Sequence, residues 1–151
     1  MFHIALWEPE IPPNTGNIAR TCAATGATLH LIGRLGFQLD DRSLRRAGVD
    51  YWHEVEVHRH VTFADFETAI AGATVHCLTA QATRSYTQVA YQAGDVLLFG
   101  CESRGLPEEI LARYAGQAVA IPMPAGRVRN LNLATSVGIV LYEGLRQLHH
   151  W

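Results

Sequence analysis

The chain has 151 residues, of which 48% are hydrophobic and 17% are charged, with a formal net charge of −2. This length and apolar content suffice for one domain with its own core, and a slightly acidic chain has no general attraction for nucleic acid. No apolar run reaches the length of a membrane span and the first residues lack a signal-peptide pattern, so we expect a cytoplasmic protein that does not bind membranes.

Hydrophobic periodicity predicts strands and helices that alternate along the whole chain. The apolar runs typical of buried strands are 2–7, 28–32, 53–58, 73–79, 95–99 and 117–121. The segments with helical spacing of apolar residues are 17–25, 40–47, 63–71, 107–115 and 132–149. This alternation predicts an α/β fold in one domain, residues 1–151, with a mainly parallel sheet and helices on both faces.

Three segments rich in proline, glycine and polar residues follow predicted strands directly. They are EPEIPPNTGN at 8–17, GCESRGLP at 100–107 and the first half of IPMPAGRVRNLNLATSVGIVLYE at 121–143. Turn-forming residues alone could make these segments simple connections. The carboxyl ends of parallel strands lie at one edge of a sheet, however, and ligands bind in the crevice there. The three loops together therefore favour a ligand site.

The cysteines and histidines do not indicate a metal site. Cys22, Cys77 and Cys101 are odd in number and widely spaced, which argues against disulfides and zinc, and no nearby base marks Cys101 as a nucleophile. His58 and His60 would share one face of a strand, but no carboxylate or cysteine completes a ligand set. We expect these two histidines to face solvent on an edge strand.

Three motifs follow one another at a recognisable spacing: PNTGNIARTCAATG at 13–26, LLFGCESRGLP at 97–107 and the whole of 121–143. They resemble the three motifs of the SPOUT class of RNA methyltransferases. With LRRAGVDYW at 44–52, the chain resembles more narrowly the TrmL family, which methylates the ribose 2′-hydroxyl of wobble cytidine or uridine in tRNA. The resemblance implies a C-terminal deep trefoil knot, a homodimer, tRNA as the partner, with leucine tRNAs as substrates, and S-adenosylmethionine as the methyl donor, released as S-adenosylhomocysteine.

The same resemblance places the cofactor in loops at the ends of three predicted strands. Backbone groups there are expected to hold the adenine and ribose, and Gly105 is expected to permit a close approach of the backbone to the ligand. The implied cofactor-binding residues are Leu78, Thr79, Gly100, Glu102, Gly105, Ile121, Met123, Asn130 and Leu131.

The residues on the substrate side also follow from the resemblance. Arg20, Tyr142 and Asn130 are implied to be catalytic, and because a guanidinium stays protonated we expect Arg20 to stabilise charge rather than act as a base. Asn130 stands where the family usually has serine, so an amide would replace that hydroxyl. The residues implied to bind tRNA are Asn14, Arg20, Arg45, Arg46, Arg129 and Asn132.

Two other classes of function stay open at this point. The NTGN segment after the first strand is compatible with the phosphate-binding loop of a flavodoxin-like nucleotide-cofactor binder. The replacement at Asn130 is compatible with a non-catalytic RNA-binding protein of the SPOUT fold. Arg20 itself could be a plain surface arginine on the polar side of the helix predicted at 17–25.

Overall fold

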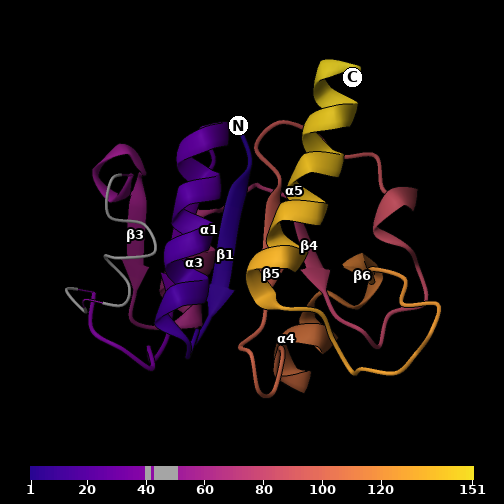
Figure 1. Cartoon of the computed structure of the whole chain (residues 1–151), viewed down its shortest axis with the longest axis horizontal. Coiled ribbons are helices and arrows are strands. Elements are labelled where there is room, and N and C mark those ends of the chain that lie inside the picture. The colour runs from indigo at the N-terminus through magenta and orange to yellow at the C-terminus, as the bar shows by residue number, and fades with distance from the viewer. Residues whose placement is uncertain (40–41, 43–50) are drawn as a thin grey trace.

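The computed structural model describes residues 1–39, 42 and 51–151 (Figure 1). In this part of the chain six strands form one sheet in the order β3-β2-β1-β5-β4-β6, and all neighbouring strands run parallel. The strands are β1 (His3–Trp7), β2 (Thr28–Ile32), β3 (Val57–His60), β4 (Val75–Leu78), β5 (Val96–Phe99) and β6 (Ala118–Val119). The parallel sheet confirms the predicted α/β fold class.

Helices connect these strands. The α-helices of the described chain are α1 (Pro12–Thr25), α3 (Phe63–Ala69), α4 (Glu108–Arg113) and α5 (Leu133–His149). Three short 3₁₀ helices are η1 (Trp52–Glu54), η2 (Tyr86–Gln88) and η3 (Ala115–Gln117). None of the helices in the described ranges is long and apolar enough to cross a membrane.

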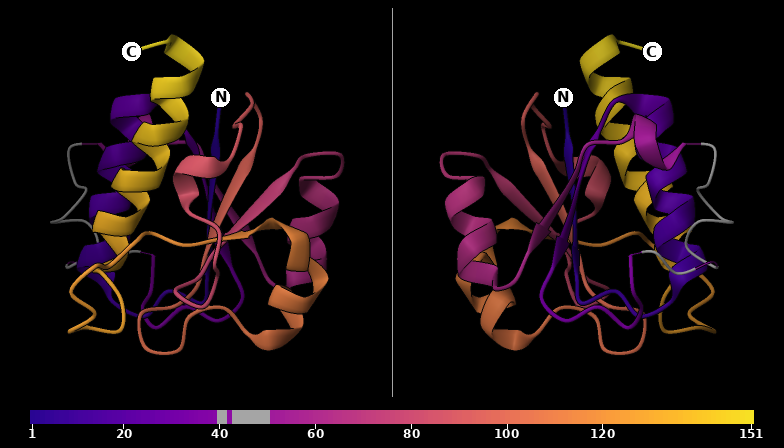
Figure 2. Two further views of the ribbon diagram at one scale, coloured as in Figure 1. Left: turned by 90° about the vertical axis from the view of Figure 1, so that its right-hand side faces the viewer. Right: turned by 90° about the vertical axis from the view of Figure 1, so that its left-hand side faces the viewer.

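The helices cover both faces of the sheet, as predicted. Figure 2 shows α1 and α5 on one face and α3 and α4 on the other. Successive strand residues point to opposite faces, so Ile4 and Leu6 of β1 pack beneath α1 and α5 whereas Ala5 packs beneath α3 and α4. Gly144 lets α5 lie close to the sheet, since a Cβ there would come within 2.7 Å of the Phe2 ring. The long helix is therefore held firmly, and its first residues have a fixed place.

The predicted elements differ from the structure mainly in two places. α1 begins at Pro12 rather than at residue 17, because proline is tolerated in the first turn of a helix, where N–H groups lack intrahelical partners. The prediction of a strand at 53–58 is wrong for its first residues. The segment Trp52–Glu54 forms η1, and β3 begins only at Val57. The helix predicted at 40–47 lies almost entirely outside the described residues.

Three histidines form a hydrogen-bonded chain across β1, β2 and β3 on the face covered by α3. The His3 Nδ1 to His30 Nε2 distance is 2.9 Å, and the His30 Nδ1 to His60 Nε2 distance is 2.8 Å. His60 is buried against Phe66, so the expectation that it faces solvent is wrong, whereas His58 is exposed. Burial lowers the pKa of His30 to about 3 and also lowers the pKa values of His3 and His60. Among the described residues no group of three or more His, Cys, Asp and Glu side chains could hold a metal ion.

Candidate active site

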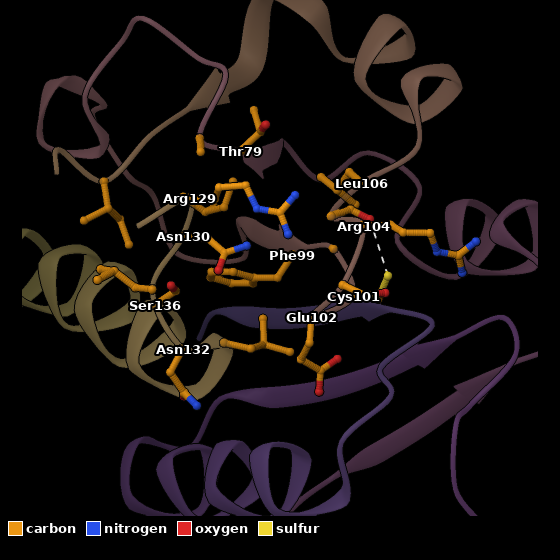
Figure 3. A pocket seen from close by; sticks show the side chains of 18 of the residues that line it. Thr79, Phe99, Cys101, Glu102, Arg104, Leu106, Arg129, Asn130, Asn132 and Ser136 are labelled. Carbon is orange, nitrogen blue, oxygen red and sulfur yellow. Dashed lines mark hydrogen bonds between the residues drawn. The ribbon is translucent and has the colours of Figure 1, made fainter. Parts of the chain in front are cut away.

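A cavity of about 390 Å³ opens at the carboxyl ends of β4, β5 and β6 beside the first turn of α5 (Figure 3). This volume lies in the range of small-molecule sites. Much of its lining comes from three loops, 79–81 after β4, 100–106 after β5 and the end of 121–132 after β6. The cavity includes every residue implied for cofactor binding, namely Leu78, Thr79, Gly100, Glu102, Gly105, Ile121, Met123, Asn130 and Leu131. The structure thus brings these residues together, and their contact with a cofactor stays a prediction.

The loop after β5 folds back on itself tightly. The Gly105 N–H donates to the Cys101 carbonyl at 2.9 Å, and a Cβ at Gly100 would come within 2.0 Å of the Gly105 carbonyl carbon. Gly100 therefore has to be glycine for steric reasons. Gly105 has a φ of +69°, which glycine adopts readily, and a Cβ there would meet nothing within 4 Å. Within this loop the crowded backbone contact lies at Gly100, while Gly105 leaves open space for a ligand.

Glu102 connects this loop to the start of α1. One carboxylate oxygen accepts the backbone N–H of Glu10 at 2.9 Å, and the other accepts the N–H of Ile11 at 2.8 Å and the Asn14 amide at 3.2 Å. The unpaired N–H groups and positive dipole at a helix start favour a carboxylate in this position. In Figure 3 the Glu102 carboxylate points away from the centre of the cavity. Its oxygens are thus engaged inside the chain, which gives Glu102 a structural task beside the implied contact with the cofactor.

Glu10 makes the same connection in the opposite direction. Its Oε1 accepts the backbone N–H of Ser103 at 2.9 Å and the Ser103 hydroxyl at 2.7 Å. These hydrogen bonds lower the pKa of the Glu10 carboxyl. We call the set Glu10, Ile11, Asn14, Glu102 and Ser103 the carboxylate clasp. It holds the loop after β5 against the start of α1, and each of the two segments contributes one carboxylate.

Asn132 joins the third loop to the carboxylate clasp. Its Nδ2 donates to the Asn14 Oδ1 at 3.0 Å, and its Oδ1 accepts the Thr135 N–H at 3.2 Å as the N-cap of α5. Both asparagines line the cavity, so the structure brings Asn14 and Asn132 together across 118 positions of sequence. One polar network therefore fixes the three motifs relative to one another. The binding of tRNA by the amides of Asn14 and Asn132 stays a prediction.

The loop 121–132 supplies two accessible polar side chains of the cavity. Arg129 and Asn130 are exposed and line it. Figure 3 shows the Arg129 guanidinium extending over the cavity, whereas the Arg104 side chain points away from it. A guanidinium and an amide can both donate hydrogen bonds to a phosphate or a hydroxyl. This rim is thus suited to an anionic, hydroxyl-bearing ligand next to the enclosed part of the cavity.

Two residues implied to be catalytic lie outside the cavity lining of this chain. Arg20 is exposed on α1, and its guanidinium carbon lies 5.1 Å from the centroid of the Tyr51 ring. Tyr142 is 47% exposed on α5, and its ring centroid is 6.4 Å from that of Trp151. One copy of the chain therefore does not bring these side chains to the cavity. The other implied tRNA-binding residues, Arg45 and Arg46, lie outside the described residues.

Sequence reasoning missed several residues that line the cavity. Phe99 and Leu106 are buried and read as core positions, although they border the tight loop at Gly100. Ser136 follows one turn after the N-cap of α5 and faces the cavity. Cys101 also lines it as a buried free thiol, while Cys22 and Cys77 are core residues as predicted. Phe99 and Leu106 lie at the two ends of the loop inside the motif at 97–107, and this position was a signal that could have indicated these two residues.

Sequence similarity places the chain in a known family of methyltransferases. Residues 1–142 match the SpoU rRNA Methylase family, and the chain belongs to this family. It is 48% identical over 149 residues to the tRNA (cytidine(34)-2′-O)-methyltransferase of Escherichia coli strain K12, covering 98% of this chain and 94% of that protein. It is 45% identical over 148 residues to the tRNA (cytidine(34)-2′-O)-methyltransferase of Methylovorus glucosotrophus, covering 97% and 96% of the two chains.

Solved structures give the same result. A structure that addresses 2′-OH methylation of C/U34 on tRNA is similar with a TM-score of 0.96 and 51% sequence identity, covering 100% of this chain and 98% of that one. An rRNA methyltransferase from Sinorhizobium meliloti with bound AdoMet is similar with a TM-score of 0.87 and 34% identity, covering 97% of this chain and 56% of that one. The described fold is thus that of RNA methyltransferases.

Proposed function

We propose that this protein is an S-adenosylmethionine-dependent enzyme that methylates the ribose 2′-hydroxyl of the wobble nucleotide of tRNA, cytidine or uridine at position 34. The observation that carries the proposal is the similarity over nearly the whole chain, at 45% to 51% identity, to proteins associated with this reaction. The geometry supports it independently, because one cavity is built from all three motifs. Leucine tRNAs are the substrates we expect.

The cavity fits S-adenosylmethionine on the chemistry of its lining. Apolar side chains of Leu78, Leu106 and Ile121 suit an adenine ring, and the tight glycine loop at 100–106 exposes backbone groups to the cavity. The steric requirement for glycine at Gly100 keeps that loop in its folded form. When bound, the cofactor supplies an electrophilic methyl group on a sulfonium. The chain has to hold it, exclude water and present the ribose to it.

Methyl transfer needs a ribose hydroxyl that is aligned with the methyl group and can lose its proton. The Asn130 amide is exposed at the cavity and can donate to that hydroxyl or to the ligand. A guanidinium is a cation with several hydrogen-bond donors, so we assign Arg20 to stabilising the phosphate or the developing alkoxide. Arg129, which extends over the cavity, is suited to a phosphate of the RNA.

A homodimer would complete this site. Arg20 and Tyr142 are exposed on α1 and α5 but lie outside the cavity of their own chain, so a second copy would have to bring such side chains to it. Light scattering should then give twice the chain mass of 16.6 kDa. A fully active protein that is monomeric at micromolar concentration would contradict the composite site.

Three further proposals rest on the family. The chain is one SPOUT domain over 1–151, its C-terminal part forms a deep trefoil knot, and the enzyme acts in the cytoplasm. β4 lies between β5 and β6 in the sheet, so the connection from β5 to β6 has to pass across β4, which is compatible with the knot.

One incubation tests the proposed activity. The protein is mixed with S-adenosylmethionine labelled in its methyl group and, separately, with bulk tRNA and with rRNA. We expect label in tRNA and none in rRNA. Tight RNA binding with no label would favour a non-catalytic RNA-binding homologue, and flavin absorbance in the purified protein would favour the flavodoxin-like alternative, which the comparisons do not support.

A further inference from the structure

The Arg20 guanidinium lies over the Tyr51 ring at the surface of the molecule. The Arg20 guanidinium carbon lies 5.1 Å from the centroid of the Tyr51 ring. Both residues are exposed, Tyr51 to 37%. This surface contact joins α1 to the residue directly before η1.

The segment that begins with Tyr51 is anchored to the fold. The Tyr51 carbonyl accepts the Glu54 N–H at 2.9 Å in the turn that forms η1, and the next residue, Trp52, packs against the core. η1 also contacts α1 directly. The ring therefore stands beside the exposed side of α1, where Arg20 projects.

The flat face of a guanidinium and its in-plane edge make different kinds of contact. An aromatic ring engages the face by a cation–π contact, and it leaves the in-plane N–H groups available for a phosphate or a hydroxyl. A carboxylate partner would occupy those N–H donors instead. An exposed arginine otherwise samples many rotamers, and ordering it on binding opposes the reaction.

We propose that Tyr51 is a positioning residue for the methyl transfer, which holds the Arg20 guanidinium by its face and leaves its edge directed at the tRNA backbone. This inference rests on the proposed function and on the role assigned to Arg20. The aromatic ring carries the effect, and the phenol hydroxyl is not needed. The cation–π contact strengthens when bound RNA removes water from it.

A double-mutant cycle on the full-length protein tests the proposal, with tRNA methylation and S-adenosylhomocysteine affinity measured for each variant. Tyr51→Ala should lower kcat about two- to thirtyfold, the range from an exposed to a desolvated cation–π contact, with cofactor affinity unchanged. Tyr51→Phe should retain most of the activity, and Tyr51→Leu, which keeps apolar volume without the ring, should behave as Tyr51→Ala. In the Arg20→Ala background, Tyr51→Ala should have no further effect.

The outcomes separate this inference from its alternatives. Val61→Ala, which removes another exposed apolar side chain, should leave activity unchanged and serves as the control. Additive losses in the double variant would mean that Tyr51 contacts the RNA by itself, and a near wild-type rate for Arg20→Ala would leave nothing to position, so either result overturns the proposal. A loss of cofactor affinity or thermal stability in both Tyr51→Ala and Tyr51→Leu would show a merely structural role. Failure of the proposed function is distinguishable, because the wild-type protein would then not methylate tRNA at all.

Discussion

The carboxylate clasp predicts that Glu102 contributes to the stability of the fold as well as to the cofactor site. Glu102→Ala removes three charge-assisted hydrogen bonds, to the N–H groups of Glu10 and Ile11 and to the Asn14 amide. Hydrogen bonds to charged groups contribute about 1.5–3 kcal/mol each, but water can replace the partner of the exposed Ile11 N–H. We therefore expect a loss of about 2–4 kcal/mol in the free energy of unfolding.

Thermal denaturation and calorimetry together measure this effect. For a chain of this length, a loss of that size lowers Tm by about 5–15 °C. The affinity for S-adenosylhomocysteine should fall as well, because the loop 100–106 is no longer held against α1. Glu109→Gln, which changes an exposed carboxylate on α4, is the matched control and should alter neither quantity.

Two combinations of results would contradict this prediction for Glu102. If Glu102→Ala loses cofactor affinity while Tm stays within about 1 °C of wild type, the carboxylate acts mainly on the ligand, and the clasp does not stabilise the fold. A lowered Tm with unchanged cofactor affinity would show instead that the loop keeps its shape without the clasp.

Three further predictions test other parts of the structure. Gly100→Ala should abolish cofactor binding, because its Cβ would meet the Gly105 carbonyl carbon at 2.0 Å; normal affinity by calorimetry would show that the loop can relax. Arg20→Ala should lower turnover about 10²- to 10³-fold with cofactor affinity unchanged, and Arg20→Lys should fail almost as badly because it lacks the planar fork; near wild-type rates would mean a plain surface arginine. The pKa of His30 is lowered from 6.5 to about 3, so the unfolded state binds more protons between these values and stability falls as pH drops below about 6.5. His30 should contribute a loss of about 1–2 kcal/mol between pH 7 and pH 5, which urea titrations would detect and which His30→Phe should reduce; an unchanged pH dependence in that variant would refute the assignment.

The sequence predicts strands and helices best where the local pattern of apolar residues decides the structure. β2 and β5 are buried on both faces and read as short apolar runs, and the apolar face of α5 repeats at helical spacing. The start of α1 was missed because two prolines look like a turn, although the first turn of a helix accepts them. Pattern along the chain is thus enough for the fold class and for the placement of loops at one sheet edge.

The contacts that define the site depend on tertiary structure and could not be predicted in the same way. The hydrogen bond from Asn14 to Glu102 joins residues 88 positions apart, and that from Asn132 to Asn14 joins residues 118 apart. The hydrogen-bonded histidine chain forms only because β1, β2 and β3 are neighbours in the sheet, and pattern along the sequence does not give that order. The family resemblance named the polar residues of the motifs, but only the folded chain shows that several of them bind one another.

The most direct test of the proposed reaction is methylation of a leucine tRNA that differs from its control at one atom. Two transcripts are prepared, one with a ribose and one with a 2′-deoxyribose at the wobble nucleotide, and each is incubated with the protein and methyl-labelled S-adenosylmethionine. We predict that the first transcript accepts one methyl group, located at the wobble nucleotide by mass spectrometry, and that the second accepts none. Equal labelling of both transcripts would contradict the account.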